Sequence, residues 1–336
     1  MNTERFEDKI RWSRVESYEE HYSPYCDQVY YTSSQDPALQ LAMRVEKPAV
    51  PGPILVMTHG WHQTIVPFEP WEEPGDSPYL VIQVDMRGRS FSMGQADCNG
   101  YELMDIYDAV QAARSRYADY ISDPELVYFE AGSGGGGNAF ALAGKFPDFF
   151  AAVNALYGIS DYAEWYRCDY VGEFRDELDV WVGKDPDLDP MAYAARSGLT
   201  TVRNLLSPIF ITHGALDPRV PVYHSRMFVE AAKAAGKTDL ITYYEMEGVG
   251  MPKHISGATQ DQLDTMRTLA DRNLMLHSSP IELPRKGSLI VAGYVVTKHF
   301  KVFLDSLDKV ARLNYDLDED SFSLECSVPC EYRIEK

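Results

Sequence analysis

A serine followed by four glycines, Ser133 and residues 134–137, constrains the fold of this chain more than any other feature. The apolar residues 126–129 before it have the pattern of a buried strand, and residues 138–146 after it have the pattern of a helix. A serine at such a strand-to-helix corner has a strained backbone and needs small neighbours, because larger side chains would make the strand and the helix collide. The segment therefore predicts a nucleophile elbow with Ser133 at its tip.

Two other interpretations of a glycine run fit this segment less well. A phosphate-binding P-loop would continue with Lys and then Ser or Thr, and a dinucleotide-binding fingerprint usually has an acidic residue about 20 residues further on. This run continues with Asn138 and Ala139 instead. The first glycine of the usual G-x-S-x-G pattern is replaced by Ala131, which is small enough for the turn.

The length and charge of the chain limit its class and its partners. A chain of 336 residues accommodates one large α/β domain with a small appendage, or two domains. The formal net charge of −20 argues against nucleic acid and anionic membrane surfaces as partners. No apolar run approaches the length of a membrane-spanning helix, and residues 1–20 lack the pattern of a secretory signal. With five cysteines that lack paired zinc spacing, we expect a cytoplasmic protein with reduced thiols.

Patterns typical of strands and helices alternate along most of the chain, which predicts an α/β fold with a mostly parallel central sheet flanked by helices. We assign residues 1–283 to this α/β domain, and an antiparallel hairpin at residues 28–31 and 39–45 is expected to lead into its sheet. The expected strands are residues 54–58, 80–85, 126–131, 152–157, 209–212 and 240–246, and the expected helices are residues 101–120, 138–146, 222–235 and 259–276.

Two segments depart from this alternation. Residues 161–196 are rich in aromatic and acidic side chains, and we interpret them as a cap-like helical insertion over the carboxyl edge of the sheet. Because ligands of such folds bind beyond the strand ends, the insertion is expected to form one wall of a substrate cleft; a solvated helix hairpin is the alternative. Residues 284–336 contain short β-forming runs that predict a small antiparallel β appendage, which binds a partner, covers a sheet edge or forms a homo-oligomer.

A serine hydroxyl is a weak nucleophile, so Ser133 needs a base within hydrogen-bond reach, usually a histidine held by a carboxylate. Asp217 lies on the loop after the expected strand at residues 209–212, four residues beyond His213. We interpret Asp217 as the acid of such a triad, with a helix-leading turn residue as the alternative. His213 is at the end of the strand itself and is better placed to bind backbone groups of the loop than to act as the base.

Four motifs occur in order: THGW at residues 58–61, DMRGRS at 85–90, AGSGGGG at 131–137 followed by KFPD at 145–148, and HGALDPRVPV at 213–222. With these motifs the chain resembles the α/β-hydrolase superfamily, and specifically the catalytic domain of the prolyl oligopeptidase-like (S9) family and related esterases. The resemblance covers residues 50–280 and implies an α/β-hydrolase fold. Because only about 50 residues precede the THGW strand, we do not expect the β-propeller of the oligopeptidases, and this argues against oligopeptidase activity.

The resemblance leaves the position of the base open. The family usually has a histidine in a short turn after the last strand of the sheet, and Val249 occupies that position here. His254, five residues further on, is the nearest substitute, and we predict that its loop turns back towards Ser133. The alternative is an exposed loop histidine and a broken triad. His62 is the reserve candidate.

The resemblance also implies two donors for a developing oxyanion, the backbone N–H groups of Trp61 and Gly134. The sequence contains no H-E-x-x-H motif, no paired C-x-x-C and no EF-hand spacing, so we expect neither a metal nor another cofactor.

These observations support three functions. The first is a serine hydrolase that cleaves a small polar ester, such as an acylated sugar, through an acyl-enzyme intermediate. The second is an S9-like peptidase or aminopeptidase, in which Asp161 or Glu164 would hold the substrate amine. The third is a degenerate hydrolase that binds a ligand or partner without turnover, as the valine at position 249 suggests.

Overall fold

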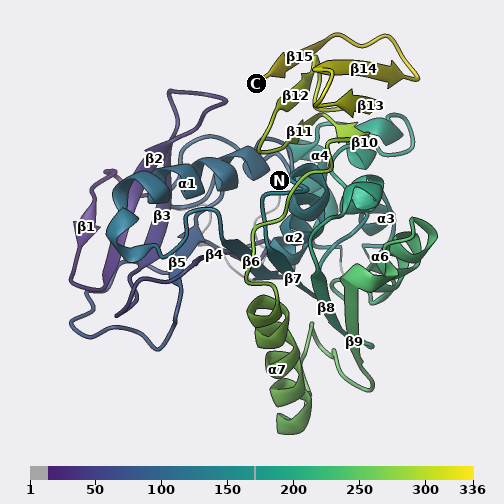
Figure 1. The fold of residues 1–336 in the computed structure, drawn as a ribbon. Coiled ribbons are helices and arrows are strands. Elements are labelled where there is room, and N and C mark those ends of the chain that lie inside the picture. The colour runs from purple at the N-terminus through teal and green to yellow at the C-terminus, as the bar shows by residue number, and fades with distance from the viewer. Residues whose placement is uncertain (1–13, 170–171) are drawn as a thin grey trace.

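The computed structural model describes residues 14–169 and 172–336, which form a central sheet flanked by helices and a second, smaller sheet (Figure 1). Within these residues the central sheet has nine strands in the order β1-β2-β3-β5-β4-β6-β7-β8-β9. Neighbouring strands from β5 to β9 run parallel, whereas β1, β2 and β3 form an antiparallel extension that meets β5. The strands are β1 (His21–Tyr22), β2 (Cys26–Thr32), β3 (Gln40–Glu46), β4 (Ile54–Thr58), β5 (Leu80–Val84), β6 (Val127–Gly132), β7 (Ala152–Leu156), β8 (Ile209–Gly214) and β9 (Ile241–Met246).

Helices cover both faces of the central sheet. Apolar residues of α1 (Glu102–Arg116), α2 (Gly134–Lys145) and α6 (Tyr223–Ala234) share one buried cluster with alternate residues of the parallel strands. Residues on the opposite face of the same strands pack against Leu274 of α7 (Gln260–Leu276). Short 3-10 helices lie at η3 (Ala118–Tyr120) and η5 (Thr238–Leu240). None of the helices in the described part of the chain combines the length and apolarity that crossing a bilayer requires.

Helix α2 begins four residues earlier than its sequence pattern predicts, because the glycine run forms its first turn. Glycine disfavours a helix interior by about 1 kcal/mol relative to alanine, which made residue 138 the expected start. Tertiary packing outweighs that preference here. A Cβ atom at Gly136 would lie 2.6 Å from the carbonyl oxygen of Leu156 on the neighbouring strand β7, so only glycine permits the helix to approach the sheet so closely.

The described residues of segment 161–196 contain three helices, as expected: α3 (Tyr162–Arg167), α4 (Arg175–Trp181) and α5 (Pro190–Ala194), followed by η4 (Gly198–Asn204). Its aromatic side chains form a small core of their own. The rings of Trp165 and Phe174 lie 4.2 Å apart, and Trp165 is almost completely buried. Trp61, from the loop after β4, packs into this core, so the insertion lies against a loop at the carboxyl edge of the central sheet.

The C-terminal residues form an antiparallel sheet, shown in yellow-green and yellow in Figure 1, with the order β14-β13-β10-β11-β12-β15. It does not stand apart from the rest, because Tyr294 and Val296 belong to the main core beside α2. The ammonium of Lys145, at the end of α2, donates to the carbonyl oxygen of Ala292 at 2.6 Å, and burial lowers its pKa to about 7. The strands are β10 (Lys286–Ala292), β11 (Tyr294–Val296), β12 (Lys301–Leu304), β13 (Val310–Asp316), β14 (Ser321–Cys326) and β15 (Tyr332–Glu335).

Candidate active site

Ser133 lies at the turn between β6 and α2, as the sequence predicts. Its backbone has φ 59° and ψ −120°, a region that a residue with a side chain rarely adopts. Hydrogen bonds on both sides of the turn stabilise this strained conformation. The N–H of Ser133 donates to the carbonyl oxygen of Leu156 at 3.0 Å, and the carbonyl oxygen of Ser133 accepts from the N–H of Gly137 at 3.1 Å. A serine held in this way projects its hydroxyl beyond the end of the strand.

The glycine after Ser133 brings two loops into contact. A Cβ atom at Gly134 would lie 2.6 Å from the backbone nitrogen of Trp61, a distance that real side chains do not reach. The backbone N–H groups of positions 61 and 134 are therefore close together beside Ser133. This is the arrangement expected of two donors that share one oxyanion.

Asp217 and His254 form a direct hydrogen bond, although 37 residues separate them. The Nδ1 atom of His254 lies 2.8 Å from Oδ2 of Asp217. The other carboxylate oxygen accepts from the backbone N–H groups of Arg219 and Val220, at 3.0 and 3.3 Å, so the loop after β8 fixes the direction of the acid. The imidazole of His254 also stacks on the ring of Tyr157, with centroids 4.7 Å apart.

The carboxyl group of Asp217 is completely buried, which by itself raises its pKa. The nearby imidazoles of His213 and His254 outweigh this effect, so the pKa of Asp217 is well below its usual range and the group is a carboxylate at neutral pH. His213 lies 3.6 Å from the acid, but its Nε2 atom is 2.7 Å from the carbonyl oxygen of Val220 and its Nδ1 atom 2.7 Å from the hydroxyl of Ser225. Both ring nitrogens of His213 are thus used to hold the loop.

The loop that carries His254 reaches the acid by a close backbone approach. Gly250 has φ 132°, and a Cβ atom there would lie 2.4 Å from the backbone nitrogen of Asp217. Val249, where the family resemblance leads one to expect a histidine, is almost completely buried, and its carbonyl oxygen accepts from the N–H of Leu216 at 2.7 Å. Position 249 therefore ties the two loops together, and the imidazole comes from position 254.

A cavity of 320 Å³ lies at the carboxyl edge of the central sheet, among the loops that follow β4, β6, β7, β8 and β9. Both Ser133 and His254 line it, so the structure brings the five residues singled out from the sequence into one site. Among the described residues, none of those that line this cavity carries a carboxyl group. The lining consists of Thr58, His59, Gly60, Trp61, His62, Gln63, Gly132, Ser133, Tyr157, Arg219, Lys253 and His254.

His62, the reserve candidate for the base, is held by the insertion. Its Nδ1 atom lies 3.0 Å from a carboxylate oxygen of Glu173, and its Nε2 atom lies 2.9 Å from one of Glu177. The ring of Phe174 stacks on the imidazole at 5.3 Å. With carboxylates at both ring nitrogens, His62 is better placed to anchor the insertion than to accept a proton from Ser133.

The insertion also holds Trp61 and Arg219, contacts that sequence reasoning did not identify. Glu177 accepts from the indole N–H of Trp61, and Glu173 forms an ion pair with Arg219. From the other side, Arg89 donates to the backbone carbonyl oxygen of Trp61 at 2.9 Å. Glu173 lies just before α4 and Glu177 lies in its first turn. Their partners are too distant in sequence to be inferred from this spacing.

The loop after β4 is further fixed by buried groups. Asp85 accepts from the backbone N–H groups of Ile65 and Phe91, at 3.1 and 3.0 Å, and burial raises its pKa to about 6. Burial also lowers the pKa of His59 to about 3, so this imidazole is neutral and its Nε2 atom accepts from the N–H of Met86 at 3.1 Å. Asp85 and His59 thus have structural roles. In residues 14–169 and 172–336 there is no cluster of three or more side chains suited to bind a metal ion.

Comparison with known proteins relates the chain to one family. The family model described as the prolyl oligopeptidase family matches residues 76–271. Dipeptidyl peptidase family member 6 of Caenorhabditis elegans is 30% identical over 223 residues, which are 61% of this chain and 29% of that protein. Esterase LipC of Mycobacterium tuberculosis is 25% identical over 236 residues, which are 64% of this chain and 57% of that protein. The chain thus spans less than two thirds of the length of either relative.

Solved structures confirm the α/β-hydrolase fold. An acylaminoacyl peptidase of Pyrococcus horikoshii superposes with a TM-score of 0.63 and 18% identity, covering 77% of this chain and 43% of that one. An esterase of Pyrococcus furiosus superposes with a TM-score of 0.56 and 14% identity, covering 79% of this chain and 97% of that one. At these identities the likeness extends to the fold alone.

Proposed function

The chain belongs to the prolyl oligopeptidase family, and from this premise we propose that it is a serine hydrolase that cleaves small polar esters, with acylated sugars as the favoured class. Ser133 is the proposed nucleophile, His254 the base and Asp217 the residue that orients the base. The 2.8 Å hydrogen bond between His254 and Asp217 is the main support for this proposal. His254 and Ser133 also line the same cavity.

The proposed reaction proceeds through an acyl-enzyme intermediate. The hydroxyl oxygen of Ser133 attacks the ester carbonyl carbon while its proton passes to Nε2 of His254, whose Nδ1–H donates to Asp217. The oxyanion accepts from the backbone N–H groups of Trp61 and Gly134. The intermediate then collapses, and the imidazolium gives its proton to the leaving alcohol. Water, deprotonated by the same imidazole, releases the acid and restores Ser133.

The charges of the cavity favour an ester over a substrate with a free amine. Asp161, a candidate for binding an amine, accepts instead from the N–H groups of Ala163 and Glu164 as the cap of α3, at 2.9 and 3.1 Å. The carboxylate of Glu164 accepts from the Cys168 thiol at 3.2 Å, and neither acid lines the cavity. A substrate ammonium would therefore meet cationic rather than anionic side chains, a repulsion that a neutral ester avoids.

A fluorophosphonate probe tests the proposed nucleophile. We expect stoichiometric labelling of the purified chain, read by intact mass, that is lost in Ser133→Ala and strongly slowed in His254→Ala. The control is His21→Ala, which removes an exposed histidine that is distant in sequence from Ser133. This variant should be labelled like the wild-type chain. An unlabelled wild-type chain would contradict the proposed hydrolase activity and favour a degenerate, ligand-binding protein.

A substrate panel tests the choice of ester over peptide. We expect turnover of p-nitrophenyl acetate and of acetylated monosaccharides, and no comparable turnover of aminoacyl p-nitroanilides. Faster cleavage of the aminoacyl anilides, abolished by Ser133→Ala, would replace the esterase proposal by an aminopeptidase.

A further inference from the structure

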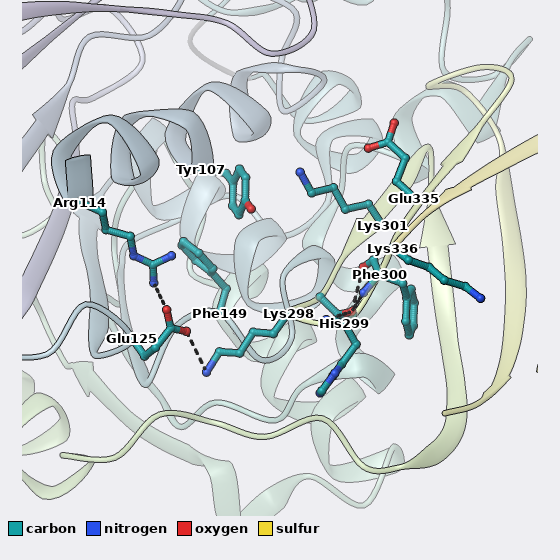
Figure 2. A pocket seen from close by; sticks show the side chains of 11 residues that line it. Tyr107, Arg114, Glu125, Phe149, Lys298, His299, Phe300, Lys301, Glu335 and Lys336 are labelled. Carbon is teal, nitrogen blue, oxygen red and sulfur yellow. Dashed lines mark hydrogen bonds and ion pairs between the residues drawn. The ribbon is translucent and has the colours of Figure 1, made fainter. Parts of the chain in front are cut away.

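A second cavity, of 300 Å³, lies between the α/β part of the chain and the C-terminal sheet (Figure 2). One wall comes from α1 and from the segment around Phe149, and the other comes from residues 297–301 and the last two residues of the chain. Among the residues that the structure describes, it shares none of its lining with the cavity that contains Ser133. Cavities between two structural units are common sites for small ligands.

The charge of this cavity is opposite to that of the whole protein. The chain carries a formal net charge of −20. Among the described residues, the cavity is nevertheless lined by four basic side chains and two acidic ones, Glu125 and Glu335. A local excess of positive charge on an acidic protein attracts small anions and concentrates them there. The basic side chains are those of Arg114, Lys298, Lys301 and Lys336.

Most of these cations are already paired. Glu125 lies between Arg114 and Lys298, with ion-pair distances of 3.2 and 3.6 Å, and both pairs are drawn in Figure 2. Lys336 forms an ion pair with Asp320 at 2.5 Å. These contacts leave one basic side chain of the cavity to be accounted for.

That side chain is Lys301, at the start of β12. Among residues 14–169 and 172–336, no carboxylate lies within ion-pair distance of its ammonium. The charge of Lys301 does act on the more distant Asp108, where it opposes the burial that raises the pKa of that carboxyl group. The ammonium lies 4.9 Å from the ring centroid of Tyr107, towards which it points in Figure 2. The ring holds the charge in place without using its hydrogen-bond donors.

Beside this ammonium the cavity has an aromatic wall. The rings of Tyr107 and Phe149 lie 5.1 Å apart at an angle of 50°, and Figure 2 shows them next to each other on the side that Lys301 faces. A flat apolar group can pack against these rings while an oxyanion on the same molecule reaches the ammonium. His299 also lines the cavity, but its imidazole points away from these rings in Figure 2.

We propose that this junction is a binding site for a small aromatic oxyanion, a phosphate monoester or a carboxylate, whose charged group binds Lys301 and whose ring packs on Tyr107 and Phe149. Because both structural units line the cavity, the bound anion would link α1 to the C-terminal sheet. The site is separate from the proposed catalytic residues.

Calorimetric titration with phenyl phosphate tests this site on the full chain at low ionic strength. We expect saturable binding that is unchanged in Ser133→Ala, weakened about tenfold in Lys301→Gln and retained in Lys301→Arg. Inorganic phosphate should bind more weakly, because it lacks the ring. The matched control is Lys253→Gln, which removes a lysine from the cavity near Ser133 and should leave binding unchanged.

Three results would overturn the assignment. The first is the absence of saturable binding by the wild-type chain. The second is binding that Lys253→Gln weakens and Lys301→Gln does not, which would place the anion in the other cavity. The third is equal affinity for phenyl phosphate and inorganic phosphate, which would remove the role of the aromatic wall.

Discussion

The carboxylate of Glu177 accepts a hydrogen bond from the indole N–H of Trp61, although 116 residues separate them. The helical insertion thereby holds the residue whose backbone N–H is a proposed oxyanion donor. The same carboxylate oxygen lies 2.9 Å from His62, so one side chain of α4 fixes two neighbouring residues of the loop after β4. The insertion contributes to the site through this loop.

Replacing Glu177 should therefore affect catalysis more than its position outside the triad suggests. We expect Glu177→Ala to lower kcat on p-nitrophenyl acetate by about tenfold to a hundredfold, with a smaller change in KM, because a misplaced oxyanion donor costs transition-state stabilisation. Glu164→Ala, on α3 of the same insertion, is the control. Equal kcat values for the two variants would mean that the position of Trp61 does not depend on Glu177.

The approach of the base loop to the acid depends on Gly250. We expect Gly250→Ala to abolish ester hydrolysis, because its Cβ atom would lie 2.4 Å from the backbone nitrogen of Asp217 and would push the two loops apart. Gly248→Ala is a matched control: its φ is also positive, at 72°, but a Cβ atom there meets nothing within 4 Å. It should cost about 1 kcal/mol of stability and keep the activity. Comparable activity of both variants would contradict this account.

Moving the histidine to position 249 should not restore a triad. We expect the double variant His254→Ala, Val249→His to be as inactive as His254→Ala, because position 249 is 2% exposed and does not line the cavity. Burying an imidazole there should also lower the free energy of unfolding by about 1–3 kcal/mol. Esterase rates and urea unfolding curves measure both effects, and a rescued rate would show that the loop can present its side chain at position 249.

The stability of the protein should fall between pH 6.5 and pH 5, in part because of His224. Burial lowers the pKa of this imidazole to about 3, and neither ring nitrogen has a hydrogen-bond partner in the part of the chain that the structure describes. Its contribution is fully present above pH 6.5, where the unfolded histidine is also neutral, and it is lost as the pH falls towards 3. The loss is about 1.4 kcal/mol per pH unit.

Urea unfolding at pH 7 and pH 5 measures this dependence. His224→Leu should reduce the difference in unfolding free energy between the two pH values by about 2 kcal/mol, because it removes the group that the unfolded chain protonates. The exposed His21 provides the control, and His21→Leu should leave the difference unchanged. An unaltered difference in His224→Leu would show that the imidazole is charged or solvated in the folded state.

Local patterns in the sequence were sufficient for much of this architecture. Alternating apolar runs and helical spacing identified the parallel strands, and the small residues around Ser133 identified its corner. The predicted start of α2, at residue 138, was wrong. The low helix propensity of glycine takes no account of the close contact between Gly136 and Leu156, which only glycine permits. The order of strands in the C-terminal sheet was not predicted, because β15 pairs with β12, some thirty residues away in the sequence.

The site was harder to predict than the fold, because its decisive contacts join distant residues. The sequence supplied Ser133 and Asp217 through their local motifs, and His254 only as the nearest substitute for a histidine missing from the expected turn. The contacts of Glu173 with Arg219 and of Glu177 with Trp61 carry no local pattern. They depend on how the insertion folds back, and this becomes visible only in three dimensions.

The buried hydrogen bond between Lys145 and Ala292 limits how far this protein can be shortened from its C-terminal end. Lys145 closes the helix that starts at the elbow serine, and the C-terminal sheet supplies both its hydrogen-bond acceptor and, in Tyr294, a ring 4.4 Å from its ammonium. Cutting the chain before β10 would leave that helix end without its cover and open the main core to water. A shortened version of this chain must therefore retain the C-terminal sheet to keep its main core closed.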